Sequence, residues 1–308
     1  MCAMSTEQFI SVIEELGRRI RTIEWDFLST QYTLKTPDDL DSIVEKQLTF
    51  RQGRLLIETD SLRHRGHVTM ISRWHHGAAP YCGHKIWVSF DGTQYRIGDR
   101  TRHGAEIPLD SDLSMGSISN QPKDYRQKWA FESGLIYLAP FFHTDDHHVQ
   151  TFAETLRCKR DRGLEIRDSD EEPDIWLICF PDGRETCRVE YCWSKGVVRS
   201  IKLGGGNPFR AYRARVAEGF VEVSDGFWVP TTVRAMCIPC GSPPELTRIE
   251  FHSVTVNRPV VDSDFRIELP EGMQVDDHIL KKTYAIGQDV DEPAAIQMYR
   301  QRNRLAQD

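Results

Sequence analysis

The feature that most constrains the fold is a series of glycine-containing turns between short alternating runs. Asp91-Gly92, Asp182-Gly183, Lys195-Gly196 and Asp225-Gly226 each separate two segments in which apolar and polar residues alternate. Such dipeptides adopt the positive φ angles of tight hairpin turns, and a period of two is typical of a strand with one buried face. Strands that meet at tight turns pair with their neighbours in the chain, so the sequence predicts an antiparallel meander rather than alternating βα units.

The alternating runs predict strands along most of the chain. They cover residues 53–60, 67–74, 84–90, 93–99, 174–180, 184–193, 197–203, 219–224, 227–237, 246–256 and 265–269. In the last of these, Phe265, Ile267 and Leu269 share one face. The sequence therefore predicts a mainly β protein.

Helices are expected at the start, in the middle and at the end of the chain. Residues 5 to about 28 predict one amphipathic helix, because apolar side chains recur every three or four positions. These are Phe9, Ile13, Leu16, Ile20, Ile23 and Phe27. Ser5 and Gln8 have the spacing of a capping box at its start. The segment 125–160 suggests short helices or a lid.

The domain organisation follows from where the β pattern stops and resumes. Residues 101 to about 170 interrupt the meander, yet no Pro- or Ser-rich linker bounds them and the pattern returns after Pro173. We therefore expect one domain over residues 1–290, with an excursion at about 101–170. Residues 291–308 predict a C-terminal helical tail.

Composition excludes several classes of partner. A formal charge of −7 argues against a protein that binds a nucleic-acid backbone, which needs a basic surface. No run approaches the ~18 apolar residues of a membrane-spanning helix. The first residues lack the basic and apolar regions of a secretory signal. A hydrophobic fraction of 39% suits a chain with a well-packed core, and we expect a monomer.

Two clusters contain residue types that can bind metals, and each has a simpler explanation. His143 and His147 have helical i,i+4 spacing, and Asp145 or Asp146 could add a carboxylate, but Thr144-Asp145-Asp146 also reads as a helix start. Cys237 and Cys240 form a single CxxC without the second pair that zinc sites use. We expect no metal, no cofactor and no catalytic centre, because no nucleophile elbow accompanies them either.

Three stretches resemble a known family. They are VSFDGTQYR at 88–96, EVSDGFWVPTTV at 222–233, and the ending with Asn257, Pro259, Val260, Asp262, Phe265, Ile267, Pro270 and Gly272. Together with the leading helix they resemble the LolA/LolB-like family of outer-membrane lipoprotein-sorting and carrier proteins. In that family a strand-DG-x-W-x-P-strand hairpin is followed by an N-x-P corner, a D-x-x-F strand and a P-x-G turn.

The resemblance implies an unclosed antiparallel β-barrel, or half-barrel, covered by the N-terminal amphipathic helix and short helices. It also implies a cell-envelope or periplasmic location, with a cytoplasmic one as the alternative because the chain shows no signal. A curved sheet closed by a helix can enclose an apolar cavity. The residues expected to line it are Phe9, Ile13, Leu16, Ile20, Trp193, Trp228, Phe265 and Ile267.

The expected function is non-catalytic binding or carriage of a hydrophobic ligand, either an acyl chain or a lipidated protein. Two alternatives stay open from the sequence. One is an envelope-sensing or regulatory binding module on the same scaffold. The other is a metal-dependent hydrolase that uses His143, His147 and an aspartate.

Overall fold

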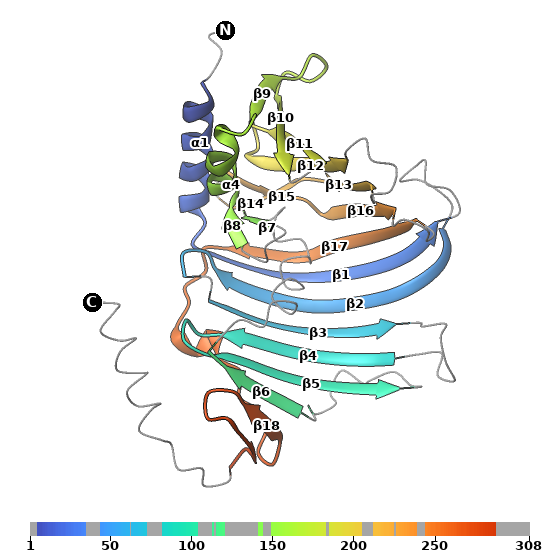
Figure 1. Ribbon diagram of the computed structural model, residues 1–308, viewed down its shortest axis with the longest axis vertical. Helices are drawn as coiled ribbons and strands as arrows, with labels where there is room; N and C mark the ends of the chain where they lie inside the picture. The colour runs from blue at the N-terminus through green and yellow to red at the C-terminus, as the bar shows by residue number, and fades with distance from the viewer. Residues whose placement is uncertain are drawn as a thin grey trace, which may run out of the picture. The chain divides into compact units, whose positions relative to one another are not determined.

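The protein is mainly β, as the sequence predicts. A computed structural model describes residues 5–34, 44–61, 63–72, 82–103, 113, 115–120, 141–143, 149–182, 185–204, 212–224, 226–238 and 244–287. Its α-helices in these ranges are α1 (Thr6–Arg19) and α4 (Phe152–Arg160), and η1 (Asp262–Phe265) is one turn of 3₁₀ helix. Figure 1 shows strands making up most of the described chain.

The strands are numerous, and in the described residues they range from three to fifteen residues in length. The first half of the chain contributes β1 (Thr22–Leu34), β2 (Val44–Glu58), β3 (His64–Ser72), β4 (Cys82–Phe90), β5 (Tyr95–His103), β6 (Met115–Ser119), β7 (Phe141–His143) and β8 (Val149–Thr151). The second half contributes β9 (Glu165–Asp168), β10 (Ile175–Asp182), β11 (Glu185–Cys192), β12 (Val197–Gly204), β13 (Tyr212–Glu218), β14 (Val221–Ser224), β15 (Phe227–Val229), β16 (Thr232–Ile238), β17 (Glu245–Val256), β18 (Gln274–Asp277) and β19 (Lys282–Ala285).

Within the described residues, fifteen of these strands form one hydrogen-bonded sheet. Their order is β19-β18-β6-β5-β4-β3-β2-β1-β17-β16-β13-β12-β11-β10-β9. The sheet is not closed, because β19 and β9 end the series. The expectation of purely antiparallel pairing is wrong at one place: β18 runs parallel to β6, so the sheet is mixed. Pairs β14-β15 and β7-β8 form separate two-stranded ribbons.

Internal contacts group the chain into two compact units. Unit 1 contains residues 1–50 and 124–257, and unit 2 contains residues 51–123 and 258–308. Each unit therefore combines segments that lie far apart in the sequence. The single domain over 1–290 stays a prediction, and the helical tail at 291–308 lies outside the described residues.

The glycine-containing turns are confirmed as hairpins. Asp91-Gly92 joins β4 to β5, and Lys195-Gly196 joins β11 to β12. Asp182 ends β10 opposite Glu185 of β11, and Gly226 lies between the antiparallel strands β14 and β15. Gly92, Gly196 and Gly226 all have positive φ (97°, 68° and 80°), which explains why glycine occupies the turns.

The N-terminal helix is shorter than the sequence predicts. Its capping box forms as expected: the Gln8 amide donates to Ser5 Oγ, and the Ser5 amide donates to Gln8 Oε1. The helix ends at Arg19, however, and residues 22–34 form strand β1. Ile23, Trp25 and Phe27 are fully buried in alternation with less buried neighbours, which is strand periodicity. Ile20, Ile23 and Phe27 fit a helical seam as well, but Trp25 does not.

Asn257 fixes the corner between α1 and β1 in unit 1. Its side-chain amide donates to the Arg19 carbonyl, and its Oδ1 accepts from the Arg21 amide, both at 2.8 Å. Its backbone amide donates to the Thr22 carbonyl, also at 2.8 Å. Asn257 has φ 56°, a left-handed conformation that asparagine tolerates better than most residues. The end of β17 thus holds the point where the helix becomes a strand.

In unit 2, residues 265–269 differ from expectation. Phe265, Ile267 and Leu269 are buried on one face, as the alternation predicts, but the segment is not a strand. It begins as the 3₁₀ turn η1 and continues as extended chain without a partner strand among the described residues. The next strand, β18, pairs with β6 only after the turn at Gly272.

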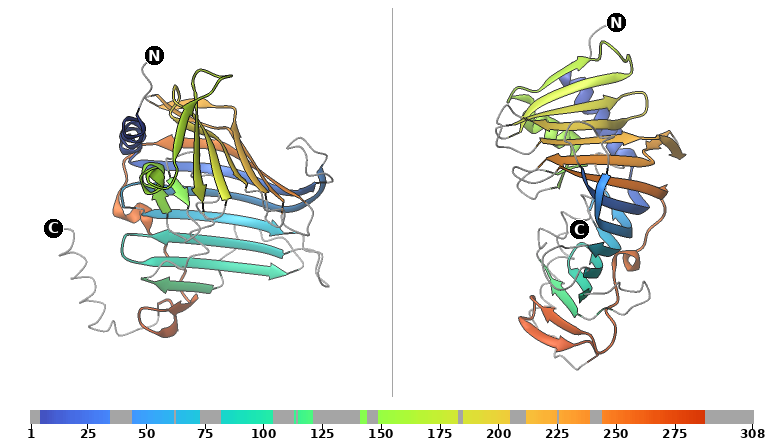
Figure 2. Two further views of the ribbon diagram at one scale, coloured as in Figure 1. Left: turned by 45° about the horizontal axis from the view of Figure 1, so that its top comes forward. Right: turned by 90° about the vertical axis from the view of Figure 1, so that its right-hand side faces the viewer.

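The interruption at 101–170 holds one helix in its described part. The expectation of a short helix is confirmed by α4, which lies beside α1 in unit 1 (Figures 1 and 2). Arg157 of α4 forms an ion pair with Glu14 of α1. The described interruption also contains the strands β6, β7, β8 and β9.

Candidate functional site

The candidate site in unit 1 is a row of aromatic rings that we call the aromatic ladder. It consists of Phe9, Phe152, Trp176, Tyr191 and Trp193. Trp176 and Tyr191 are directly opposite each other on β10 and β11, so their side chains lie on the same face of the sheet. Their rings stack at 6.3 Å, and Trp193 stacks on Trp176 at 6.2 Å.

The two helices close the inner end of the aromatic ladder. Phe9 of α1 meets Trp176 and Tyr191 edge to face, with ring centroids 4.8 and 5.7 Å apart. Phe152 of α4 lies 6.3 Å from Tyr191. Such contacts stabilise the packing beyond the apolar area they bury. Burial also raises the pKa of the Tyr191 hydroxyl, so this side chain stays uncharged at neutral pH.

The outer end of the aromatic ladder is Trp193, whose side chain is 48% exposed. Its one polar atom, Nε1, already donates to the Pro173 carbonyl at 3.2 Å. The indole therefore offers the solvent an apolar face with no unmet hydrogen bond of its own. An aromatic ring of this kind contacts apolar groups at little polar cost.

Hydrogen bonds fix the turn that carries Trp193. The Trp193 amide donates to the Asp174 carbonyl at 3.0 Å. Ser194 Oγ and Cys192 Sγ both donate to Asp174 Oδ2, at 2.9 and 3.3 Å. The bond from Ser194, followed by the bond from Cys192, lowers the pKa of Asp174, so its carboxylate remains charged and the turn remains anchored at neutral pH.

The structure separates the sequence-predicted apolar residues of unit 1 by burial. Phe9, Ile13 and Ile20 are buried and belong to the core beneath α1, whereas Leu16 is half-buried. Leu16 Cδ1 would lie 3.2 Å from a Cβ on Gly196, so the Trp193 turn packs against α1 near this residue. Trp228 is half-buried and packs on Ile175, Cys192 and Val197.

The remaining two predicted residues, Phe265 and Ile267, lie in unit 2 and are completely buried. They belong to a segment that we call the strap, residues 258–270. Phe265 lies beneath the Arg63 guanidinium, which is 4.5 Å from the ring centroid. Ile267 packs with Leu269, Ile118 and Val275. The use of all eight residues as a ligand-binding set stays a prediction.

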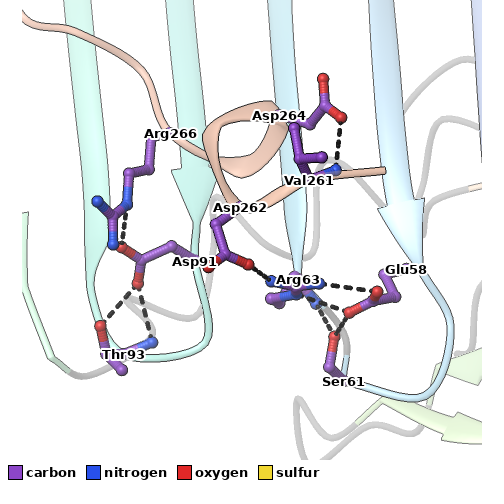
Figure 3. Close-up of polar contacts among 9 residues, drawn as sticks. All are labelled: Glu58, Ser61, Arg63, Asp91, Thr93, Val261, Asp262, Asp264 and Arg266. Carbon is purple, nitrogen blue, oxygen red and sulfur yellow. Dashed lines mark hydrogen bonds and ion pairs between the residues drawn. The ribbon is translucent and has the colours of Figure 1, made fainter. Parts of the chain in front are cut away.

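Charged groups hold the strap at two points, which we call the ionic latches (Figure 3). In the first latch, Arg63 Nη1 donates to Asp262 of η1 at 2.7 Å. Arg63 also makes a bidentate contact with Glu58, through Nε at 2.6 Å and Nη2 at 2.8 Å. The hydrogen bonds from Arg63 lower the pKa of Glu58, and the two carboxylates raise that of Arg63, so the latch remains charged at neutral pH.

The second ionic latch joins Arg266 to Asp91 in the β4-β5 turn. Arg266 Nε donates to Asp91 Oδ2 at 3.1 Å. Asp91 Oδ1 accepts from the Thr93 hydroxyl and amide and from the Gln94 amide, at 2.7, 3.0 and 2.9 Å. Burial alone would raise the pKa of Asp91, but these hydrogen bonds and the Arg266 charge lower it overall. Sequence reasoning found this turn but missed its carboxylate as a tether.

The metal-binding candidates find no support in the described part of the chain. His143 ends strand β7 rather than lying on a helix, and residues 144–148 lie outside the described residues, as does Cys240. Across the ranges given above, no three His, Cys, Asp or Glu side chains gather where a metal ion could bind. In the same ranges, no helix is long and apolar enough to span a bilayer.

Comparison with known proteins finds distant likenesses of structure and no match of family or sequence. No protein-family model matches the chain, and no curated protein matches it. The chain is similar to a crystal structure of a β-barrel-like protein of a domain of unknown function, DUF1849, from Brucella abortus. The TM-score is 0.23 and the identity 12%, over 78% of this chain and 100% of that chain. Membership of the LolA/LolB-like family stays a prediction.

Proposed function

We propose that the protein is a non-catalytic binding protein for a hydrophobic ligand, either an acyl chain or a lipidated partner protein. The observation that carries the proposal is the outer end of the aromatic ladder. Trp193 is 48% exposed, yet it is stacked, hydrogen-bonded and held in a fixed turn. A rigid aromatic face loses little conformational entropy when it contacts a ligand.

The energetics limit how tightly such a ligand binds. Removing ten methylene groups from water contributes about 8 kcal/mol in gross terms, at ~0.8 kcal/mol each. Ordering of the chain and loss of its free tumbling offset part of this. We expect a dissociation constant of roughly 10–100 μM. Because the contact is apolar, binding should change little with salt concentration.

Titration with 11-(dansylamino)undecanoic acid, a fluorescent fatty-acid probe, tests the proposal. Trp193→Ala should weaken binding about tenfold, since one aromatic contact contributes up to ~1.5 kcal/mol. Trp193→Phe keeps an aromatic face and should restore most of the affinity. The control is Val221→Ala, which truncates another exposed apolar side chain of unit 1, 44% exposed, outside the aromatic ladder.

The proposal fails if the folded wild-type protein does not bind the probe. It also fails if Trp193→Ala and Val221→Ala bind the probe as tightly as the wild type. The cell-envelope location and the identity of the ligand follow only from the family resemblance and belong to the proposal.

A further inference from the structure

The exposed indole of Trp193 lies against a turn rich in carboxylates, which we call the acidic turn. Residues 168–174 connect β9 to β10 and contain five acidic side chains and no basic one. They are Asp168, Asp170, Glu171, Glu172 and Asp174. Trp193 Nε1 donates to the Pro173 carbonyl, which lies between two of them in the chain, and the Trp193 amide donates to the Asp174 carbonyl. The indole therefore belongs to a strongly negative part of the surface.

Hydrogen bonds close the acidic turn. The Ser169 amide donates to the Ile175 carbonyl at 3.0 Å, and the Ile175 amide donates to the Glu172 carbonyl at 3.1 Å. Ser169 Oγ accepts from the amides of Glu171 and Glu172, both at 3.3 Å. The backbone that carries the carboxylates is thus already fixed, so a partner that pairs with them does not have to order the turn.

Cations of unit 1 neutralise only part of this charge. Arg199 forms an ion pair with Glu172, and Lys195 lies close enough to Asp174 to act on its carboxylate. The other three carboxylates are exposed and form no ion pair within the described ranges of the chain. They belong to Asp168, Asp170 and Glu171. Their charge is available to a cation from a partner.

The aromatic ring and the carboxylates share one face of the sheet. One face of the Trp193 ring stacks on Trp176, which leaves the other toward the solvent. Asp168 is directly opposite Trp176 on the neighbouring strand, so its side chain lies on the same face of the sheet as the aromatic ladder. The face of an indole attracts a cation electrostatically, and a carboxylate nearby adds to the attraction.

The chain itself places a cation on aromatic rings beside this surface. The Lys195 ammonium lies 5.1 Å from the ring centroid of Trp228 and 5.6 Å from that of Phe220. Asp174 of the acidic turn supplies a carboxylate near this ammonium. Aromatic faces and a carboxylate thus already hold one cation two residues from Trp193. In the described part of the chain, no Lys or Arg lies over Trp193 itself.

The group that fits this surface best is a guanidinium. It is planar and weakly hydrated, so it stacks on an indole, and it can donate to both oxygens of a carboxylate at once. Tryptophan and arginine are also among the side chains that contribute most at protein interfaces. A free fatty acid would instead bring its own carboxylate next to the acidic turn, where like charges repel.

We propose that Trp193 and the acidic turn form a docking surface for a basic segment of a partner protein. An arginine of that segment stacks on the free face of Trp193 and pairs with the carboxylates of the acidic turn. The inference rests on the proposed function for the use of Trp193 as the contact. It adds that the partner is a protein and that the segment it presents is cationic.

Isothermal titration calorimetry with a model peptide tests the docking surface. The probe is a peptide in which Arg-Ser-Leu is repeated four times, with both ends blocked. Two matched peptides carry lysine or glutamate in place of arginine. Titrations at low salt and in 0.5 M salt measure how much of the binding is electrostatic.

The variants separate charge from stacking. The neutralised variant removes the three unpaired carboxylates of the acidic turn by Asp168→Asn, Asp170→Asn and Glu171→Gln. Its matched control removes three exposed carboxylates of unit 2 and changes the net charge equally, by Glu268→Gln, Glu271→Gln and Asp276→Asn. Trp193→Leu keeps an apolar side chain but removes the aromatic face.

We expect the wild type to bind the arginine peptide, and the neutralised variant to bind it about tenfold more weakly and with less dependence on salt. Trp193→Leu should also weaken binding by about tenfold, because the cation loses the ring. The lysine peptide should bind more weakly than the arginine peptide, and the glutamate peptide should not bind. The unit 2 control should bind the arginine peptide as the wild type does.

Three outcomes would overturn the inference. The first is a folded wild type that does not bind the arginine peptide. The second is a unit 2 control that weakens binding as much as the neutralised variant, because the effect would then come from net charge alone. The third is equal binding of the lysine and arginine peptides, because no guanidinium would then be recognised.

The dansyl probe separates this inference from the proposed function, because it carries no guanidinium. If the probe binds through Trp193 and the arginine peptide does not bind, the docking surface falls and the proposed function stands. If the peptide binds through Trp193 and the acidic turn while the probe does not bind, the hydrophobic ligand of the proposed function falls and the docking surface stands.

Discussion

Two segments that each cover a face of the sheet, α1 in unit 1 and the strap in unit 2, are attached in different ways. Helix α1 satisfies most of its backbone hydrogen bonds internally, so apolar contacts such as those of Phe9 and Ile13 are its main attachment, beside an ion pair from Glu14 and a hydrogen bond from Asn257 to its end. The strap has no such internal ladder, so it needs Ser89 and Arg96 as backbone partners and two ionic latches besides. A regular element can be attached mainly by apolar contacts, whereas an irregular segment also needs polar partners for its own backbone.

The largest expected effect falls on the apolar anchor of α1. Phe9→Ala removes a fully buried ring that contacts both Trp176 and Tyr191. Its loss should lower the free energy of unfolding by about 3–5 kcal/mol, measured by chemical denaturation. A loss below about 1 kcal/mol would contradict the view that the aromatic ladder anchors the helix.

A smaller effect is expected at the corner that positions α1. Asn257→Ala removes both side-chain hydrogen bonds and places alanine at φ 56°, so the free energy of unfolding should fall by about 1–3 kcal/mol. Asn257→Gly loses the same hydrogen bonds but tolerates the backbone angle. It should therefore be less damaging than alanine, and the reverse order would show that strain at this backbone angle contributes little to the effect.

The strap should respond to acid where α1 does not. Asp91 and Glu58 have lowered pKa values in the folded protein, so their contribution is complete above their unfolded pKa and is lost as pH falls through the folded value. Below about pH 4, the protection factor of the Ile267 amide should therefore fall further than those of the α1 amides. An equal fall in the two segments would indicate ordinary acid unfolding, and Asp91→Asn provides the control because it lacks the titrating group.

The smallest expected effect is the loss of a single ionic latch. Arg266→Ala should lower the free energy of unfolding by no more than about 1 kcal/mol, and less in 0.5 M salt. A large, salt-independent loss from Arg266→Ala would show that the strap depends on the latch rather than on its apolar side chains.

The ion pair between Glu14 of α1 and Arg157 of α4 should behave in the same way. Substitution of Glu14 should lower the free energy of unfolding only a little, because Arg157 is half-exposed.

Local patterns in the sequence predict hairpins well and pairing partners poorly. The glycine turns specify their own geometry, so Asp91-Gly92 and Lys195-Gly196 could be found without a structure. The end of α1 could not, because Ile23 and Phe27, four residues apart, fit helix and strand alike. Only Trp25, out of phase with the helical seam, indicates a strand in advance.

The strap shows what the alternation of apolar residues does not predict. Alternation correctly predicts which of its side chains are buried, but it does not reveal whether a partner strand exists. The ionic latches join Arg63 to Asp262 and Asp91 to Arg266, pairs separated by 199 and 175 residues. No spacing rule connects residues at such distances. Trp193 was predicted as a ligand contact, but its exposure and its bonded indole became visible only in the fold.

The central claim, that the protein binds a hydrophobic ligand without chemistry of its own, is tested most directly by what it carries. Protein purified from its native host without detergent can be analysed by native mass spectrometry, followed by solvent extraction and lipid analysis. The account predicts an acyl-chain-containing molecule, or a lipidated protein, bound to the wild type and depleted in Trp193→Ala. Wild-type protein that carries no such ligand, or an equal amount bound to Trp193→Ala, would contradict it.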